Sequence, residues 1–318
     1  MSTSHSPDSA KLPPLALIAG PTASGKSDLA VRLALALKAR GREAVVINAD
    51  SAQVYADLSV LSARPSPDEM QGIEHRLFGT WDGAQSCSAA DWASAARLVI
   101  AEVQARGAVP VLVGGTGLYI STLLDGIAPV PPIDPAVRDA VRALPLAQAW
   151  AALQHEDPDR AGVLSANDTA RICRALEVVR STGRGLGEWQ AQRIGGISAA
   201  VALHPAILLP DRQWLYGRCN RRFDLMLEHG AIAEVERLLA RQLDPAMPVM
   251  RAIGVPELAA CLRQECSIAQ AAAQGAQATR NYAKRQFTWM RNQPPSDWLR
   301  IAEKDYNEKD IFVSLLRD

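Results

Sequence analysis

A glycine-rich segment near the N-terminus has the residue types and spacing of a phosphate-binding loop. Gly20 precedes Gly25, Lys26 and Ser27 at the required spacing, and the residues between the two glycines are Pro21, Thr22, Ala23 and Ser24. Glycines in this pattern let successive backbone N–H groups converge on phosphate oxygens at a helix N-terminus. Lys26 would add a positive charge, and Ser27 would supply a hydroxyl to a bound Mg²⁺. The segment therefore predicts a site for pyrophosphate or a nucleoside phosphate.

Two further polar residues follow apolar runs that are typical of buried strands. Asp50 comes just after the run at residues 44–48, and Thr116 follows Gly114 and Gly115 after the run at 109–113. Because α/β sheets bind ligands at the carboxyl ends of their strands, both residues are expected near the phosphate-binding loop. A carboxylate at this edge could act as a general base or belong to the coordination sphere of a metal. A helix-capping role is the structural alternative for Asp50.

The elements that must hold these residues alternate between strand and helix. Apolar runs at residues 15–19, 44–48, 109–113 and 201–209 predict strands, and Leu29, Leu33 and Leu37 recur at helical spacing after the glycine loop. Ser88 and Asp91 have the spacing of a capping box. The helix that they open would present one apolar face, made of Trp92, Ala96, Val99, Ile100 and Val103. The alternation predicts an α/β fold: a P-loop NTPase-like parallel sheet flanked by helices.

The composition changes after residue 125 and indicates an inserted domain. Four prolines, at positions 129, 131, 132 and 135, interrupt regular structure, and Ala-, Leu- and Arg-rich sequence follows as far as Gly195 and Gly196. We predict an all-helical insertion domain at 133–200 within a core domain made of 15–132 and 201–318, whose last part is helical. Residues 1–14 are polar and proline-containing, which predicts a disordered leader.

Overall composition excludes several classes of protein. The 318 residues, 48% of them hydrophobic, can form a sizeable core, and the 34 basic and 34 acidic residues cancel. A nucleic-acid partner must therefore be bound by a local basic surface. The five cysteines include no CxxC pair, which argues against a disulfide framework and a zinc ribbon and fits a reducing cytoplasm. No apolar run reaches membrane-spanning length, so no membrane partner is predicted.

Two clusters of basic residues could form such a local surface. The first cluster lies near one face of a predicted helix and consists of Arg280, Lys284 and Arg291. Tyr282, Phe287 and Trp289 lie on the same helix, and no acidic residue occurs between Thr279 and Ser296. The second cluster consists of Arg218, Arg221 and Arg222. Either cluster could instead be an ordinary solvated helix face.

Five segments, in order along the chain, match one protein family. They are Gly20-Pro-Thr-Ala-Ser-Gly-Lys-Ser27, Asn48-Ala-Asp-Ser-Ala-Gln-Val-Tyr55, Val113-Gly-Gly-Thr-Gly-Leu-Tyr119, Arg174-Ala-Leu-Glu177 and Thr279-Arg-Asn-Tyr-Ala-Lys-Arg-Gln-Phe-Thr-Trp289. The chain thereby resembles, from end to end, the tRNA dimethylallyltransferases of the bacterial type. The resemblance implies a monomeric, cytoplasmic enzyme that uses Mg²⁺ and dimethylallyl pyrophosphate. It would prenylate the exocyclic amine of the adenosine 3′-adjacent to the anticodon in tRNAs reading codons that begin with U.

The resemblance also implies roles for individual residues. Asp50 would accept a proton from the adenine amine, Thr116 would lie in the reaction channel, and Lys26 would act within the pyrophosphate-binding loop at 20–27. Ser27 would be the protein's ligand to the metal. The residues expected to contact tRNA are Asp50, Ser51, Ala52, Gln53, Thr116, Arg138, Ala170, Arg171, Ile172, Cys173, Arg174, Arg251, Arg280, Lys284 and Arg285.

Some segments depart from the pattern of this family. Arg251-Ala-Ile-Gly-Val-Pro256 replaces an Arg-x-Ile-Gly-Tyr-Arg/Lys stretch, and Leu61-Ser-Ala-Arg-Pro65 replaces Gly-Thr-Ala-Lys-Pro. Ala170 stands in place of a glutamine, and Glu74-His75 in place of a histidine pair. These departures bear on which tRNAs are accepted.

Three other functions share parts of this sequence pattern. A small-molecule kinase would use the same loop with ATP, but the run at 109–113 leads into Gly114 and Gly115 rather than into a Walker-B acid. An adenylate prenyltransferase acting on free AMP, ADP or ATP would have less need of the insertion and of the Arg280 segment. A nucleotide-gated RNA-binding module would bind RNA without needing Asp50.

Overall fold

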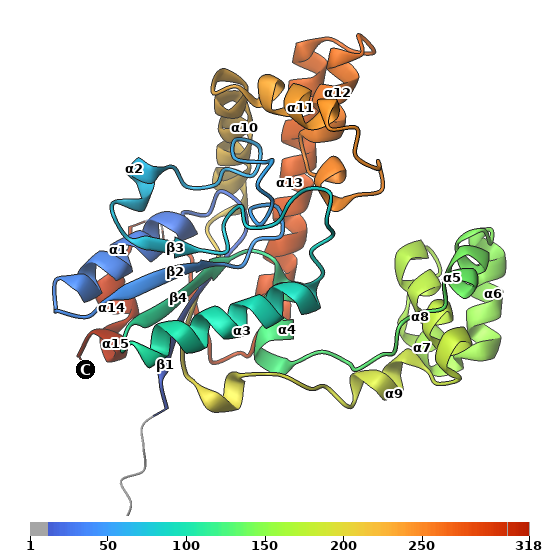
Figure 1. Cartoon of the computed structure of the whole chain (residues 1–318), viewed down its shortest axis with the longest axis horizontal. Coiled ribbons are helices and arrows are strands. Elements are labelled where there is room, and N and C mark those ends of the chain that lie inside the picture. The colour runs from blue at the N-terminus through green and yellow to red at the C-terminus, as the bar shows by residue number, and fades with distance from the viewer. Residues whose placement is uncertain (1–11, 304, 318) are drawn as a thin grey trace, which may run out of the picture. The chain divides into compact units, whose positions relative to one another are not determined.

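A six-stranded sheet organises the larger part of the protein (Figure 1). The computed structural model describes residues 12–303 and 305–317. The strands are β1 (Pro14–Ala19), β2 (Ala44–Asn48), β3 (Glu74–Arg76), β4 (Val109–Gly114), β5 (Ala202–Leu208) and β6 (Leu299–Ile301). Their order is β3-β2-β4-β1-β5-β6, and every neighbouring pair is parallel. The loops after β1, β2 and β4 consequently meet at one edge of the sheet.

The four apolar runs predicted as strands form β1, β2, β4 and β5, each within one residue of the expected ends. The strands at the two edges of the sheet, β3 and β6, were not predicted. Each has three residues, and β3 consists of Glu74, His75 and Arg76, none of them buried. Most of the predicted leader, residues 1–11, lies outside the described residues. Its last residue, Pro14, is part of β1 and pairs with Ala202.

Among the described residues, ten helices begin in the larger unit. They are α1 (Lys26–Lys38), α2 (Pro67–Met70), α3 (Ala89–Ala105), α4 (Gly117–Asp125), α10 (Arg212–Glu228), α11 (Ala231–Ala240), α12 (Val255–Leu262), α13 (Ile268–Asn292), α14 (Glu308–Ile311) and α15 (Val313–Arg317). Of these, α1 and α3 pack against the sheet. The predicted capping box opens α3, because the Ser88 side chain accepts from the Asp91 N–H and the Asp91 carboxylate accepts from the Ser88 N–H. The predicted apolar face of α3 is buried. In the described residues, no helix has the length and apolarity needed to cross a bilayer.

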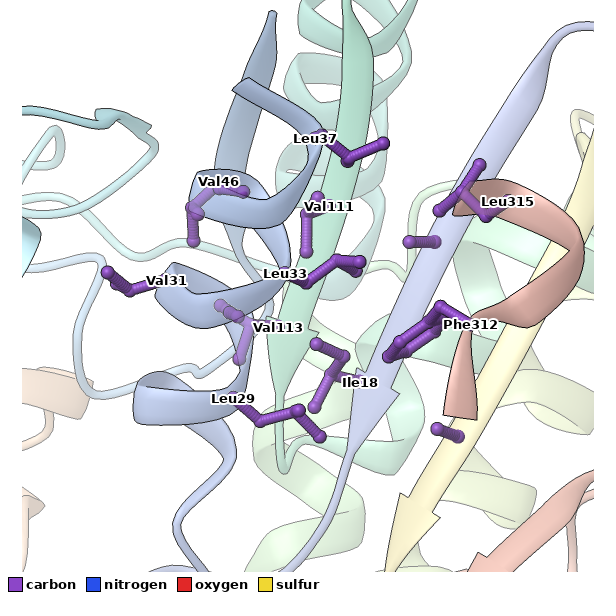
Figure 2. Close-up of a cluster of buried hydrophobic side chains, with 14 of the residues drawn as sticks. Ile18, Leu29, Val31, Leu33, Leu37, Val46, Val111, Val113, Phe312 and Leu315 are labelled. Atoms are coloured by element: carbon purple, nitrogen blue, oxygen red, sulfur yellow. The ribbon is translucent and has the colours of Figure 1, made fainter. Parts of the chain in front are cut away.

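Helix α1 fixes the phosphate-binding loop to the sheet through a buried cluster (Figure 2). Leu29, Leu33 and Leu37 are fully buried at successive turns of α1 and belong to one cluster with Ile18 of β1. Phe312, from the end of the chain, packs in the same cluster. Burying each such leucine contributes about 1.5–3 kcal/mol, so the N-terminus of α1 is held firmly in place.

The smaller unit spans residues 122–197 and is helical. Its helices are α5 (Pro135–Arg142), α6 (Leu146–Glu156), α7 (Pro158–Val163), α8 (Thr169–Thr182) and α9 (Leu186–Gln190). Its own core contains Val141, Leu153, Ile172 and Leu176. The sequence places the insertion at 133–200, whereas the compact unit starts earlier. The reason is that the proline-rich stretch pairs with the returning chain: Ile127 and Ile194 exchange two backbone hydrogen bonds of 3.0 Å.

Candidate active site

Three loops meet at the carboxyl edge of the sheet, and the loops after β1 and β2 are each hydrogen-bonded to the loop after β4. The Gly20 N–H donates to the Gly114 carbonyl at 3.2 Å, and the Thr116 N–H donates to the Ala49 carbonyl at 3.2 Å. A Cβ atom on Gly114 would lie 2.1 Å from the Ala49 carbonyl oxygen, so a glycine is needed for this approach. The structure thus brings the three predicted catalytic residues, Lys26, Asp50 and Thr116, into one region of the larger unit.

The loop at residues 20–27 is shaped to receive an anion. Gly25 has φ 96° and forms the N-cap of α1, so the first N–H groups of the helix lack partners within it. The Ser24 hydroxyl is buried and has no hydrogen-bond partner in the described part of the chain. An unsatisfied buried hydroxyl beside a helix N-terminus is suited to a phosphate oxygen.

Lys26 is the buried cation of this loop. Its side chain is 8% exposed, and Nζ donates to the Pro21 carbonyl at 3.3 Å. Burial lowers the pKa of Lys26 from 10.5 to about 8, while the charge of Asp50 raises that pKa and the charge of Arg222 lowers it. Lys26 therefore remains mostly protonated at neutral pH. An anionic ligand beside it would raise its pKa and stabilise the charged form.

A second cation, Arg222 of α10, reaches the same loop. Its Nη1 donates to the Thr22 hydroxyl at 3.2 Å. Burial lowers the pKa of Arg222, and the charge of Asp50 opposes this effect. From the sequence, Arg222 could be recognised only as one of three arginines in a basic cluster. Of the other two, Arg221 is exposed, and the guanidinium of Arg218 stacks over the Trp214 ring at 4.8 Å.

Asp50 is held by a turn at the end of β2. It is 8% exposed, its N–H donates to Asn48 Oδ1 at 2.8 Å, and its Oδ1 accepts from the Ala52 N–H at 3.0 Å. Asn48 is itself fixed, since its carbonyl accepts from the Trp92 indole N–H at 2.9 Å. The structural alternative of a helix cap does not apply, because the residues after Asp50 form turns rather than a helix. Asp50 is therefore a buried carboxylate with a fixed orientation.

Thr116 and Tyr282 complete the side of the site that carries Asp50. Thr116 Oγ1 accepts from the Ser51 N–H at 3.0 Å and donates to the Ser51 hydroxyl at 3.3 Å. The Tyr282 side chain, from α13, lies near Thr116 and Ser51, whose side chains lower the pKa of its phenol. Burial, and after it the charge of Asp50, raises the pKa of Tyr282 to about 12, so the phenol stays protonated at neutral pH.

Helix α13 also contacts the glycines on both sides of Thr116. Gln286 Nε2 donates to the Gly115 carbonyl at 2.9 Å, and a Cβ on Gly115 would lie 2.3 Å from that nitrogen. A Cβ on Gly117 would lie 2.3 Å from the Trp289 ring. The tight approach of α13 thus explains the glycines at positions 115 and 117, and the contact with Ala49 explains Gly114. The sequence placed Tyr282, Gln286 and Trp289 in a family motif but gave no local signal for these contacts.

The residues expected to contact tRNA fall in both compact units. In the larger unit, Lys284 and Arg285 are exposed on α13, and Arg251 is exposed at the end of a short 3₁₀ helix (Pro248–Arg251). Arg280 is half-buried and donates to Asn220 Oδ1. Gln53 is buried, and its Nε2 donates to the Ser62 and Ala63 carbonyls at 3.0 and 2.8 Å. Its side chain therefore shapes a loop rather than facing solvent.

In the smaller unit the expected tRNA residues lie on α5 and α8. Ala170 and Arg171 are exposed near the start of α8, and Arg174 is half-buried one turn later. Ile172 is fully buried in the core of this unit, and Cys173 packs against that core. Arg138 of α5 is half-buried, and its Nε has no hydrogen-bond partner in the described residues. Arg171 therefore places a positive charge on the exposed face of α8. The side chain of Ile172 packs in the core and is not available for contact with tRNA.

Few side chains in the described part of the chain are available to coordinate Mg²⁺. Across residues 12–303 and 305–317, no group of three or more His, Cys, Asp or Glu side chains could hold a metal ion. Mg²⁺ commonly takes one or two protein ligands and completes its octahedron with phosphate oxygens and water. Ser27, half-buried at the start of α1, is positioned for such a role. The residues present fit a metal carried by the pyrophosphate rather than a protein cage.

Comparison with known proteins identifies the family of this chain. A family model described as IPP transferase matches residues 53–293. The chain belongs to this family. The tRNA dimethylallyltransferase of Erythrobacter litoralis is 66% identical over 305 residues, which are 96% of each chain. That of Novosphingobium aromaticivorans is 63% identical and covers 87% of this chain and 99% of its own.

Solved structures of the family have the same fold. The full-length tRNA isopentenylpyrophosphate transferase of Bacillus halodurans superposes with a TM-score of 0.67, at 31% identity, over 96% of this chain and 95% of its own. A eukaryotic dimethylallyltransferase acting on tRNA gives a TM-score of 0.73, at 26% identity, over 87% of this chain and 69% of its own. The predicted P-loop NTPase-like sheet is thus confirmed.

Two of the segments that depart from the family pattern pack against each other. Gly254, at φ 96°, lies so close to Leu61 that a Cβ would be 2.5 Å from the leucine Cδ2. The loop that carries Leu61 is fixed by Glu234 of α11. The buried Glu234 carboxylate accepts from the Ser59 and Val60 N–H groups at 2.6 and 2.8 Å and from the Leu61 N–H at 2.9 Å. In this member of the family the two departing segments are therefore in direct contact.

Proposed function

We propose that the protein transfers a dimethylallyl group from dimethylallyl pyrophosphate to an adenine amine in tRNA. The target is the adenosine 3′-adjacent to the anticodon in tRNAs that read UNN codons, and the coproduct is pyrophosphate. The observation that carries the proposal is a phosphate-binding loop connected, through the loop after β4, to a third loop that holds the buried carboxylate of Asp50. Asp50 lies close enough to Lys26 and Arg222 for its charge to oppose the lowering of their pKa values by burial.

The phosphate-binding loop acts on the leaving group. As the bond between the allylic carbon and oxygen breaks, its electron pair goes to the pyrophosphate, where negative charge accumulates. Three kinds of group stabilise that negative charge: the Lys26 ammonium, the Arg222 guanidinium and the free N–H groups at the start of α1. Fixed donors of this kind each contribute about 10²–10³ in rate. A Mg²⁺ ion held by Ser27 and the pyrophosphate would supply further neutralisation of charge.

Asp50 acts on the attacking amine. The lone pair of an adenine amine is delocalised into the ring, so the nitrogen becomes a useful nucleophile only as it loses a proton. As the new C–N bond forms, Asp50 accepts that proton, a role usually worth about 10²–10⁴ in rate. Because the Asp50 carboxylate is buried and its Oδ1 is held by the Ala52 N–H, little reorganisation is required. The hydrogen-bonded pair of Thr116 and Ser51, with the protonated Tyr282 nearby, would line the site beside the amine.

The acceptor adenosine must leave its stack to reach such a buried carboxylate. Enzymes that modify bases extrude the target nucleotide and hold the surrounding backbone with basic residues. Lys284 and Arg285 of α13 provide an exposed basic surface on the helix that also carries Tyr282. The enzyme acts as a monomer in the cytoplasm, where its tRNA substrate is found.

Incubation of the purified protein with unmodified tRNA and dimethylallyl pyrophosphate tests the proposal. Mass spectrometry of the digested nucleosides is expected to detect adenosine enlarged by one five-carbon unit, in tRNAs that read UNN codons. Free AMP and ADP serve as competing acceptors, and ATP labelled in the γ-phosphate serves as a competing donor. Prenylation of the free nucleotides alone, or transfer of the label to an acceptor, would contradict the proposal.

A further inference from the structure

We infer that Gln286 is a positioning residue that sets the distance between the pyrophosphate-binding loop and the loop of Thr116. This inference rests on the proposed function, and it concerns a side chain that touches neither substrate in that proposal. Gln286 lies on α13, far along the chain from both loops, and it bonds to both of them at once.

The two halves of the Gln286 amide have different partners. Its Oε1 accepts from the Thr22 N–H at 2.7 Å, and its Nε2 donates to the Gly115 carbonyl at 2.9 Å. Thr22 is the residue whose hydroxyl accepts from Arg222, and Gly115 immediately precedes Thr116. One planar group of fixed size therefore connects the leaving-group side of the site to the acceptor side.

The surroundings of Gln286 indicate that its two loop contacts account for the presence of a polar side chain at this position. The side chain is 5% exposed and lies on the buried face of α13, whose other members are small or apolar: Ala271, Gly275, Ala276, Ala283 and Met290. A buried amide lowers stability unless both its donor and its acceptor are satisfied. An apolar residue would suit such a face better, so a glutamine there is explained by its two loop contacts.

The neighbouring glycines leave no freedom for another arrangement. A Cβ on Gly115 would lie 2.3 Å from Gln286 Nε2 and 2.8 Å from the Gly20 carbonyl oxygen. The two loops and the amide are thus in direct contact, with no space for the loops to move closer. Transfer of the prenyl group needs the allylic carbon, held by its pyrophosphate, to lie in line with the amine near Asp50. An error of about 1 Å in such an alignment can lower the rate by about a hundredfold.

Removal of the amide should therefore affect turnover more than binding. In Gln286→Met the side chain keeps its length but loses both hydrogen bonds, while Lys26, Arg222 and the N-terminus of α1 remain. We expect kcat to fall by about a hundredfold, with the Kd for inorganic pyrophosphate and the KM for dimethylallyl pyrophosphate changed by less than about threefold. Gln286→Asn keeps an amide but is one methylene too short to span both loops, and the same loss of kcat is expected.

A matched control separates positioning from stability. Met290 lies one turn further on the same buried face and contributes no polar contact, so Met290→Leu should change the melting temperature without changing the ratio of kcat to KM. Hydrogen exchange gives a readout that does not depend on activity. In both Gln286 variants, the backbone amides of residues 20–27 and 114–117 should exchange faster together.

The outcomes distinguish this inference from the proposed function. If the wild-type protein forms no prenylated adenosine, the proposed function fails, and faster exchange in both loops would still support the connection through Gln286. If the wild type is active and either folded Gln286 variant keeps kcat within about threefold, the inference is overturned. Unchanged exchange in the two loops, or an equal loss of kcat in Met290→Leu, overturns it as well.

Discussion

Deprotonation of Lys26 should weaken the binding of pyrophosphate above pH 8. With a pKa of about 8, the free protein keeps about nine-tenths of its Lys26 side chains charged at pH 7 but only about one-tenth at pH 9. A bound pyrophosphate would restore the charge, because an anion beside the ammonium group raises its pKa. Binding at pH 9 should therefore take up nearly one proton per site, and the affinity should fall about tenfold between pH 7 and pH 9.

Calorimetry at a fixed Mg²⁺ concentration, in two buffers with different ionisation enthalpies, measures this proton uptake. The control is Lys26→Met, which removes the titrating group but leaves the ionisation of pyrophosphate itself unchanged. The uptake at pH 9 that is present in the wild type and absent from Lys26→Met belongs to Lys26. Equal uptake by the two proteins would refute the reasoning, since it would mean that Lys26 is already charged at pH 9.

The same pKa fixes how Lys26 affects stability. The unfolded chain holds the Lys26 proton up to about pH 10.5 and the folded chain only up to about pH 8, so the free energy of unfolding rises with pH between these values. A shift of this size corresponds to about 3 kcal/mol. Urea denaturation should therefore find Lys26→Met more stable than the wild type at pH 7, by up to about that amount, with the difference shrinking above pH 8. A difference that grows with pH would contradict the sign of the shift.

Three other substitutions test separate parts of the site. Asp50→Asn keeps the shape of the side chain but removes the base, so single-turnover rates should fall by about 10²–10⁴ while tRNA affinity in filter binding stays within a few-fold. Gly117→Ala forces a methyl group against Trp289 and should lower both the melting temperature and the activity. Glu234→Gln replaces one carboxylate oxygen with an NH₂ group facing an N–H donor, which should cost about 1–3 kcal/mol in urea denaturation.

Each of these three substitutions is paired with a control variant or with a result that would contradict the prediction. Near-normal turnover of Asp50→Asn would remove Asp50 from the role of base. Gly217→Ala, at a helical glycine with open space around it, should instead raise stability by up to about 1 kcal/mol. Glu236→Gln changes an exposed residue of α11 and should leave the free energy of unfolding within about 0.5 kcal/mol. A Glu234→Gln variant as stable as Glu236→Gln would show that the buried carboxylate is not needed.

The central strands could be predicted because burial on both faces leaves a continuous apolar run. Residues 44–48 and 109–113 are such runs, and they form β2 and β4. The edge strands could not be predicted in this way. In β3 the residues are Glu74, His75 and Arg76, whose side chains make polar contacts, such as the salt bridge of Arg76 with Glu102 at 3.1 Å. Backbone pairing alone makes this segment a strand, and backbone pairing leaves no pattern of side chains.

The candidate site was predictable only where its residues lie within local motifs. Lys26 lies in the glycine-rich motif between β1 and α1, and Asp50 lies just after β2, so both could be assigned from the chain on either side of them. Arg222 was found only as a member of a basic cluster, since a helix sequence does not specify which of three arginines faces a loop that lies 200 positions earlier. The contacts of Gln286 are equally non-local. The packing of α10 and α13 against the larger unit determines both, and this packing is not encoded in any single segment.

The bond between Thr22 and Gln286 has a consequence for the synthesis of the protein, because it joins residues 264 positions apart. The glycine-rich loop leaves the ribosome first, and the helix residue that fixes it against its neighbour is translated 264 positions later. A nascent chain that has not yet released α13 can hold an anion at its first helix but has no fixed partner loop across from it. The two loops therefore acquire their fixed spacing only after α13 has been translated.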